Sequence, residues 1–329
     1  MDQLLASQPF QSFRSSKSLR SFKLWRSKAF TQITMIIMAS LIFNAPLSAD
    51  ESVAVDDWSV TSSVWGSLGK YQKSQSRESH SHYGTHFKAD FLESFSLDIG
   101  YQNTRIRYQL SDFKVVQDEY YAGGEYHLFS DMFEGNIGLA GHIIHAINND
   151  NSGYTDSVTA FTTTLSYRPW SQRWNLEAGA AQSNYGGNFN VTQATATFGV
   201  GFNDNYDWLQ IKGFAIRPAK NASTPFQTHD TNSAELSWKH WFTGRGHFRI
   251  DSVYVAGMLG KRQFAVDSSH FLLQNLSDIQ TNNYSAGINF RLDDCWLLGF
   301  TGSLSHYRNE TLGNQYQDSS IHINLSTKW

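Results

Sequence analysis

The sequence ends in Ile321-His322-Ile323-Asn324-Leu325-Ser326-Thr327-Lys328-Trp329, in which apolar and polar residues alternate almost to the last position. A β-strand places successive side chains on opposite faces, so this stretch has one apolar and one polar face. The same alternation recurs upstream, for example from Phe161 to Tyr167 and from Tyr284 to Leu292. The sequence therefore predicts many strands that contact an apolar medium on one face only.

The composition excludes several classes of protein. The chain has 329 residues, 15% of them aromatic and 17% charged, with one Cys and a mean hydropathy of −0.42. This mean hydropathy excludes a polytopic helical membrane protein, which needs several apolar runs of roughly 20 residues. A single Cys excludes an intramolecular disulfide and a multi-cysteine metal site. No glycine-rich phosphate loop, HExxH or paired CxxC motif is present, so we expect no cofactor and no enzymatic activity.

Residues 1–49 have the layout of a secretory signal. Basic residues end at Lys28, an apolar run follows from Thr34 to Phe43, and Ala49 precedes two acids. This order is typical of export, and the run is too short to span a bilayer comfortably. We expect cleavage after Ala49, a short periplasmic segment over 50–57 and a barrel over 58–329; an uncleaved signal anchor is the alternative.

The charge outside this signal argues against a nucleic-acid partner. Residues 1–49 hold six of the 26 basic residues and one of the 29 acidic ones, so the remainder has 20 basic and 28 acidic residues. A face that binds duplex nucleic acid would be net basic.

The polar faces of the expected strands are rich in Gly, Ala, Ser and Thr, which suits the inside of a curved wall. Aromatic girdles are typical of transmembrane barrels. Candidate girdle residues near strand ends are Phe161, Tyr167, Trp174, Trp208, Trp241, Tyr284, Trp296 and Tyr307. The predicted fold is all-β, a single antiparallel up-and-down transmembrane β-barrel; a secreted sandwich is the alternative.

Alternation predicts about fourteen strands, and twelve or sixteen also fit. They are expected near 58–70, 83–101, 104–112, 118–129, 134–146, 156–168, 173–184, 189–202, 207–217, 231–241, 247–259, 282–292, 295–307 and 318–329. With both termini in the periplasm, short turns fall there, at Gln102-Asn103, 130–133, 169–172, 203–206, 242–246 and Asp293-Asp294. The longer outer loops are 71–82, 113–117, 147–155, 185–188, 218–230, 260–281 and 308–317. Keeping long connections on one side is typical of such barrels.

With this signal and terminal strand, the chain resembles Gram-negative outer-membrane β-barrel proteins, porin-like in type. An aromatic last residue after alternating apolar positions is the signal that the barrel-assembly machinery reads in that superfamily. Ile321, Ile323, Leu325 and Trp329 match it, and Thr327 departs from it. The resemblance implies a location in the bacterial outer membrane, with lipid and lipopolysaccharide as surroundings, and leaves the oligomeric state open.

Charged residues of both signs are expected on the inward face. The candidates are Lys88, Asp90, Asp98, Arg105, Arg107, Glu125, Glu177, Lys212, Glu235, Lys239, Arg249, Asp251 and Arg291. Opposed charges in a wet lumen create a transverse field that filters polar solutes. The sequence thus favours a channel for passive diffusion of small polar solutes. A transporter of hydrophobic compounds and a non-conducting structural or surface-binding barrel, its lumen plugged by paired charges, are the alternatives.

Two further groups of residues are candidates for binding. His80, His82 and His86 share the inward parity, so a weak metal site is geometrically allowed, although solvated histidines are the simpler interpretation. The loop 260–281 carries an apolar run, Phe271-Leu272-Leu273-Gln274-Asn275-Leu276. This run either folds into the lumen as a constriction, contacts a partner or lipopolysaccharide, or packs against neighbouring loops.

Overall fold

A computed structural model describes residues 58–109, 113–150, 153–219, 227–244, 246, 248–267, 272–274 and 277–329. The expected signal over 1–49 and the segment 50–57 lie outside the described residues. In the described part of the chain, no helix is long and apolar enough to cross a membrane.

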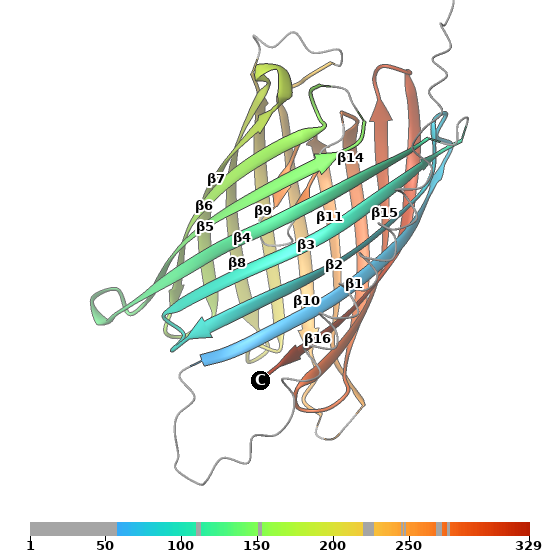
Figure 1. The fold of residues 1–329 in the computed structure, drawn as a ribbon. Helices are drawn as coiled ribbons and strands as arrows, with labels where there is room; N and C mark the ends of the chain where they lie inside the picture. The colour runs from blue at the N-terminus through green and yellow to red at the C-terminus, as the bar shows by residue number, and fades with distance from the viewer. Residues whose placement is uncertain are drawn as a thin grey trace, which may run out of the picture. The chain divides into compact units, whose positions relative to one another are not determined.

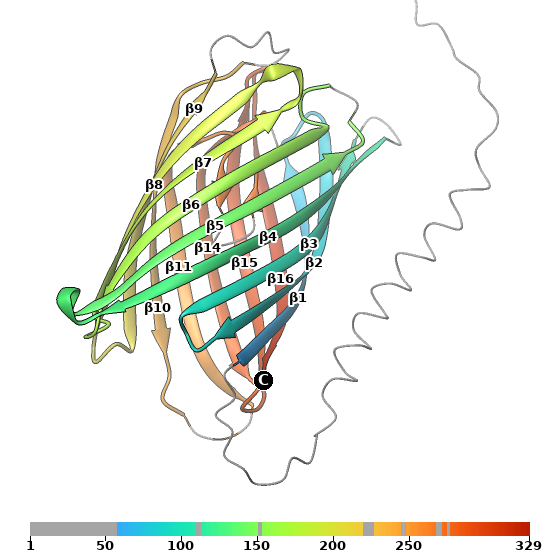
Figure 2. The same cartoon turned by 60° about the vertical axis from the view of Figure 1, so that its left-hand side comes forward.

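Fourteen strands form one closed antiparallel barrel in which each strand pairs with its neighbour in the chain, and β16 returns to β1 (Figures 1 and 2). The strands are β1 (Trp58–Gln72), β2 (Arg77–Phe91), β3 (Phe95–Tyr108), β4 (Lys114–Ser130), β5 (Gly135–Asn148), β6 (Ser157–Pro169), β7 (Trp174–Tyr185), β8 (Asn190–Phe202), β9 (Asp207–Pro218), β10 (Thr231–Trp241), β11 (Arg249–Arg262), β14 (Ile279–Arg291), β15 (Trp296–Asn309) and β16 (Asn314–Lys328). A small second sheet pairs β12 (Val266–Asp267) with β13 (Leu272–Leu273). The predicted all-β barrel of about fourteen strands is confirmed.

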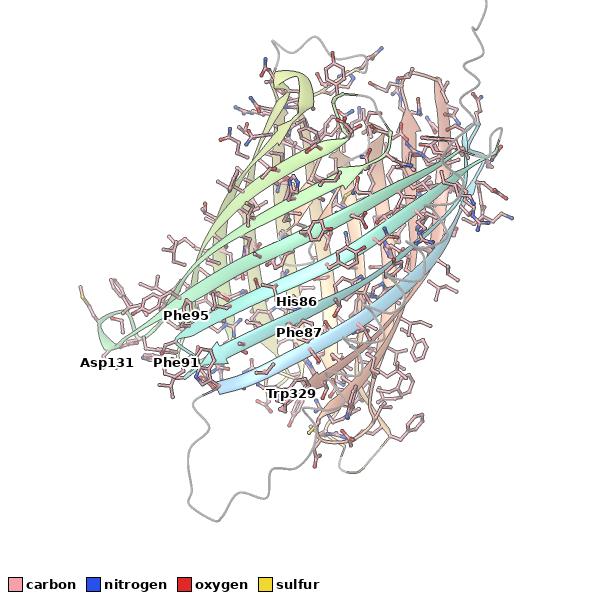
Figure 3. All side chains as sticks on the ribbon, viewed as in Figure 1. His86, Phe87, Phe91, Phe95, Asp131 and Trp329 are labelled. Carbon is pink, nitrogen blue, oxygen red and sulfur yellow. The ribbon has the colours of Figure 1, made fainter. Side chains whose placement is uncertain are left out.

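The two ends of the barrel differ in their connections. One end, here called the turn end, holds Trp58, Trp329 and the connections 92–94, 131–134, 170–173, 203–206, 242–248 and 292–295. The other, the loop end, holds 73–76, 109–113, 149–156, 186–189, 219–230, 263–278 and 310–313. Figure 3 shows Phe91, Phe95 and Trp329 close to the turn end. The two longest connections are therefore both at the loop end.

The seam between β1 and β16 closes the wall. Its register runs from Thr61 opposite Lys328 to Gln72 opposite Gln317. Val60 and Trp329 extend it by exchanging backbone hydrogen bonds of 2.8 and 3.0 Å. Because every strand then has two partners, the barrel exposes no unpaired edge.

Side chains alternate between the two sides of this wall. On β16, Ile321 and Ile323 point outward and are 63% and 45% exposed, whereas Tyr316 on the opposite parity is buried inside. Trp329 is likewise exposed. Apolar outward residues on every side of a closed wall are what a surrounding lipid phase requires.

The expected strand over 83–101 is wrong, because a turn at 92–94 divides it into β2 and β3. Leu92 and Glu93 adopt left-handed backbone angles, with φ of 48° and 57°, without a glycine to mark the turn. Phe91 and Phe95 pair across it, so the odd-numbered residues lie on the apolar outer face in both strands. The expected turn at Gln102-Asn103 is accordingly wrong as well, since both residues lie inside β3.

A β-bulge in β11 allows even-numbered apolar residues before it and odd-numbered apolar residues after it to face the same side of the wall. Ile250 pairs with Phe290 and Ser252 with Asn289, so the register shifts between them. Phe248 and Ile250 before the shift, and Val255 after it, are all exposed on the outside. An extra residue in one strand is the usual way to re-aim side chains within a sheet.

The expected girdle is only partly correct. Trp208 lies opposite inward Lys239, Trp241 lies opposite Ser252, and Tyr307 stacks on Tyr316 with ring centroids 5.3 Å apart. These three residues face inward. Trp174, Phe161 and Tyr284 face outward and are exposed.

We predict that Leu165→Lys lowers the free energy of unfolding in lipid vesicles by about 2–4 kcal/mol, because Leu165 faces outward near the middle of β6. Thr164→Lys, one residue away and facing inward, serves as the matched control and is expected to cost much less. Denaturant titration of the vesicle-inserted protein measures both. Equal losses would contradict the assignment of faces.

Candidate functional site

The connection between β11 and β14 folds into the loop end of the barrel. Within it, β12 pairs with β13, and Gln274 N–H donates to the Ala265 carbonyl at 2.8 Å. Phe264, Val266 and Leu273 are 0%, 3% and 3% exposed. Residues 263–267, 272–274 and 277–278 are called the inset segment below. Of the three alternatives for this loop, its described residues favour folding into the lumen, and Phe271, Asn275 and Leu276 of the apolar run lie outside them.

The inset segment packs against an apolar half of the inner wall. Its side chains Phe264, Ala265, Val266 and Leu273 belong to one buried cluster with inward residues of β4 to β9 and the turn after β7. The wall residues are Tyr121, Ile144, Ala146, Val158, Ala160, Ala181, Tyr185, Phe189, Val191, Phe214 and Ile216. Each fully buried large apolar side chain contributes about 1.5–3 kcal/mol. This apolar inner surface was not predicted, because the inward faces were expected to be polar.

Polar contacts hold the inset segment to β8 and β9. The Gln193 side chain donates to the Val266 carbonyl at 2.6 Å and accepts from the Val266 N–H at 3.0 Å. The Gln193 side chain therefore makes with the Val266 backbone the two hydrogen bonds that a neighbouring strand would make. One residue further on, Lys212 Nζ lies 2.8 Å from Asp267 Oδ1, with both side chains largely buried.

A second contact holds the other end of the segment to β2 and β16. Asp278 is buried at 2% and forms an ion pair with Arg77 of β2. Tyr316 of β16 donates to the same carboxylate. In the ring of fourteen strands, β2 and β16 lie across from β8 and β9. The inset segment therefore crosses the lumen between two polar attachments.

A cavity of about 360 Å³ lies against the inset segment, on the side of the turn end. Val266 and Asp267 of the segment contribute to its lining. Hydroxyl, amide and charged side chains of β2 to β9 supply most of the rest: His86, Lys88, Asp98, Tyr121, Glu125, His142, Thr162, Thr164, Ser166, Glu177, Gln193, Thr195, Thr197 and Lys212. The part of the lumen between the inset segment and the turn end is thus polar. The contacts of the segment with the wall toward the loop end are apolar.

Eleven of the thirteen candidate charges lie on the inside of the wall or at its inner bulge. The register places inward Lys88, Asp90, Asp98, Glu125, Glu177, Lys212, Glu235, Lys239, Arg249 and Arg291. Asp251 lies in the bulge and accepts from Arg291 Nη2 at 2.6 Å. Other contacts are Lys88 to Asp90 at 3.3 Å and Arg262 to Glu235 at 3.9 Å.

These charges are partly sorted around the ring, with Lys88 and Lys212 lining the same cavity as three acids and with Glu235 and Asp251 on strands that carry bases. Asp98, Glu125 and Glu177 lie on β3, β4 and β7, and all three line the cavity. Lys239, Arg249 and Arg291 lie on β10, β11 and β14. Because β3 and β4 are across the ring from β10, β11 and β14, an acidic arc faces a basic arc near the turn end. Such an arrangement produces a field across a water-filled lumen.

The expectation that Arg105 and Arg107 line the lumen is wrong. Ile106 between them is buried inside with Tyr71 and Tyr316, whereas both arginines are exposed on the outside. The expected two-residue turn at 102–103 would have turned the odd-numbered residues of the following strand from the outer face to the inner face. Since β3 instead runs unbroken from Phe95, the outward parity of Ile99 and Tyr101 continues to the arginines.

The inward histidines form contacts among themselves. The rings of His80 and His82 are 5.9 Å apart, those of His82 and His322 are 6.1 Å apart, and His80 Nε2 lies 2.9 Å from Asp318. His86 lies further along β2, 4.0 Å from Asp98. In the described ranges, no group of three or more His, Cys, Asp or Glu residues is arranged to hold a metal.

Sequence reasoning missed the residues that attach the inset segment. Gln193 was an unremarkable polar residue on an expected strand, and Arg77, Asp267, Asp278 and Tyr316 all lay in expected outer loops. Their contacts join positions 38 to 239 residues apart, such as Arg77 with Tyr316. Only the run of apolar residues in the loop indicated burial there.

No protein-family model matches the sequence, and no curated protein matches it significantly. Solved structures do match. A bacterial polysaccharide outer membrane secretin aligns with TM-score 0.52 and 9% identity over 82% of this chain and 98% of that chain. The TodX deltaS2S3 mutant monoaromatic hydrocarbon channel aligns with TM-score 0.51 and 11% identity over 84% and 91%. The fold is therefore that of outer-membrane β-barrel proteins, as the resemblance in the sequence indicated.

We predict that Gln193→Leu loosens the inset segment, because it removes both hydrogen bonds to Val266. Two hydrogen bonds contribute about 1–3 kcal/mol together, so exchange of the Val266 amide hydrogen should accelerate roughly 10- to 100-fold. Gln182→Leu on the outside of β7 is the control and should leave this exchange unchanged. Hydrogen exchange is read by mass spectrometry of the peptide that contains Val266. Equal exchange in the two variants would contradict the attachment.

Proposed function

We propose that this protein is an outer-membrane channel for the passive diffusion of small polar solutes, with its turn end and both barrel termini in the periplasm. The observation that carries the proposal is the polar cavity against the inset segment, together with the acidic and basic arcs near the turn end. A solute that passes these arcs exchanges part of its hydration for contacts with hydroxyl and charged groups. The inset segment narrows the route and sets an upper limit on solute size.

The same geometry weighs against transport of hydrophobic compounds. The apolar part of the lumen is occupied by Phe264, Val266 and Leu273, which are almost fully buried against the wall. An apolar solute would have to displace these side chains and then cross a charged cavity. The proposed role includes no catalytic step.

Membrane insertion and assembly are part of the proposal. The outward side chains of Ile321, Ile323 and Leu325, with terminal Trp329, form an apolar row on the last strand. This row would present the assembly signal to the barrel-assembly machinery before the seam with β1 forms. Lipid would then cover it in the folded protein.

The purified protein in planar lipid bilayers should give ohmic single-channel currents. Under a salt gradient, Asp98→Asn/Glu125→Gln/Glu177→Gln should shift the reversal potential toward anion preference, because the acidic arc is removed while the basic arc remains. Arg105→Gln/Arg107→Gln removes two charges on the outside of the wall and is the matched control.

The control should leave the reversal potential of the channel unchanged. Silent bilayers from correctly folded protein would overturn the channel and favour a non-conducting barrel. Currents with the same shift in both variants would show that the acidic arc does not face the permeation route.

A further inference from the structure

We propose that the outer surface of β1 to β4 at the loop end is a binding site for a phosphorylated lipid headgroup. Four cationic side chains, Lys70, Arg105, Arg107 and Lys114, are exposed on this surface, here called the basic patch. They lie outside the lumen, so the proposed channel does not use them.

The register brings these side chains together although they come from three strands. Lys70 of β1 lies opposite Ser79 of β2, Ser79 lies opposite Arg107 of β3, and Arg107 lies opposite Lys114 of β4. Paired strands are about 4.8 Å apart, so this row spans roughly 15 Å across the wall. Arg105 lies two residues further down β3 on the same face. The patch is therefore about the size of a single large headgroup.

Nearby acids do not neutralise the basic patch. Among the residues that the structure describes, none of the four cations forms an ion pair. Asp118, the outward acid on β4, instead accepts hydrogen bonds from Tyr101 at 2.7 Å and Asn103 at 2.8 Å. Glu78 lies in the register shift of β2 and forms no ion pair with the patch.

The position along β3 matches the level of lipid headgroups. From the turn end, the outward residues are Phe95, Leu97, Ile99, Tyr101, Asn103, Arg105 and Arg107, a change from apolar through aromatic to cationic. The twelve steps from Phe95 to Arg107 cover about 40 Å of strand, or about 30 Å of height at a tilt of roughly 40°. The apolar band of such barrels is about 25 Å tall. The arginines therefore lie just beyond it.

Aromatic residues form the lower border of the patch. Tyr101 and Tyr120 contact each other with ring centroids 5.5 Å apart, and the Arg105 guanidinium lies 5.9 Å from the Tyr83 ring. Tyrosines at this level stay at the membrane–water interface, and clustered cations above them recognise anionic lipids. Guanidinium groups also bind phosphate oxygens through paired hydrogen bonds. The ligand that fits is a lipid with phosphate groups on its head, as in the outer leaflet if the loop end faces outward.

Binding of diphosphorylated lipid A to the full-length protein in zwitterionic detergent tests the basic patch, with native mass spectrometry as the readout. Arg105→Gln/Arg107→Gln should weaken binding by roughly 10- to 30-fold. Arg217→Gln/Lys261→Gln removes two exposed cations of β9 and β11 at the same end and is the matched control, expected to change binding less than about twofold. If the arginine variant does not fold, Lys70→Gln/Lys114→Gln replaces it with the same expected weakening.

Three results would overturn the proposal: no weakening in the patch variants, equal weakening in the control, or equally tight binding of dephosphorylated lipid A. Inorganic phosphate is titrated separately. If it displaces lipid A at similar concentration, the patch is a free-anion site and the lipid assignment is wrong. The outcome does not depend on ion conduction, so it separates the basic patch from the proposed channel.

Discussion

The backbone hydrogen bonds of the seam between β1 and β16 are the interaction on which the rest of the molecule depends. In a bilayer, water is absent and an unpaired backbone N–H or carbonyl group costs several kcal/mol. The seam pairs these groups from residue 60 to residue 72 with the last strand. Without it, β1 and β16 would both be unpaired edges in contact with lipid. With it, each strand has a fixed inside and a fixed outside.

That fixed alternation explains which features the sequence could predict. The terminal row of Ile321, Ile323 and Leu325 indicated a one-sided apolar strand, and repetition of the pattern indicated a barrel with about fourteen strands. Inward positions for charges such as Asp98 and Lys212 followed from the same parity. Where a strand is long and its flanking turns have a recognisable composition, the alternation of apolar and polar residues is sufficient to assign its two faces.

Parity reasoning failed where the chain changed direction without a visible signal. The turn at Leu92 and Glu93 has no glycine or proline, and its odd length preserves the apolar parity from β2 into β3. A turn expected ten residues later therefore reversed the faces of Arg105 and Arg107. The attachments of Asp278 to Arg77 and of Asp267 to Lys212 were also invisible, because they join residues far apart in the sequence that have no common pattern.

The lumen combines two different environments because the chain folds back into its own barrel. Apolar wall residues of β4 to β9 would be costly in a water-filled pore, and the inset segment covers them with Phe264, Val266 and Leu273. Two polar attachments, across from each other in the ring, hold the segment, and Gln263 adds hydrogen bonds to the backbone of Gln227 and His229. The remaining lumen is polar and carries charges in opposed arcs, so the route of the proposed channel lies beside the covered apolar wall.

Closure of the wall is tested most directly by disulfide formation across the seam, in a background where Cys295 is replaced by serine. Ser63 and Ser326 lie opposite each other and face the lumen, so Ser63→Cys/Ser326→Cys should cross-link within one chain under an aqueous oxidant. Ser63→Cys/Leu325→Cys places one thiol inside and one outside, and should stay reduced. Efficient cross-linking of the first variant alone is the predicted result. Failure of the first to cross-link in folded protein, or equal cross-linking of both, would contradict a closed wall with alternating faces.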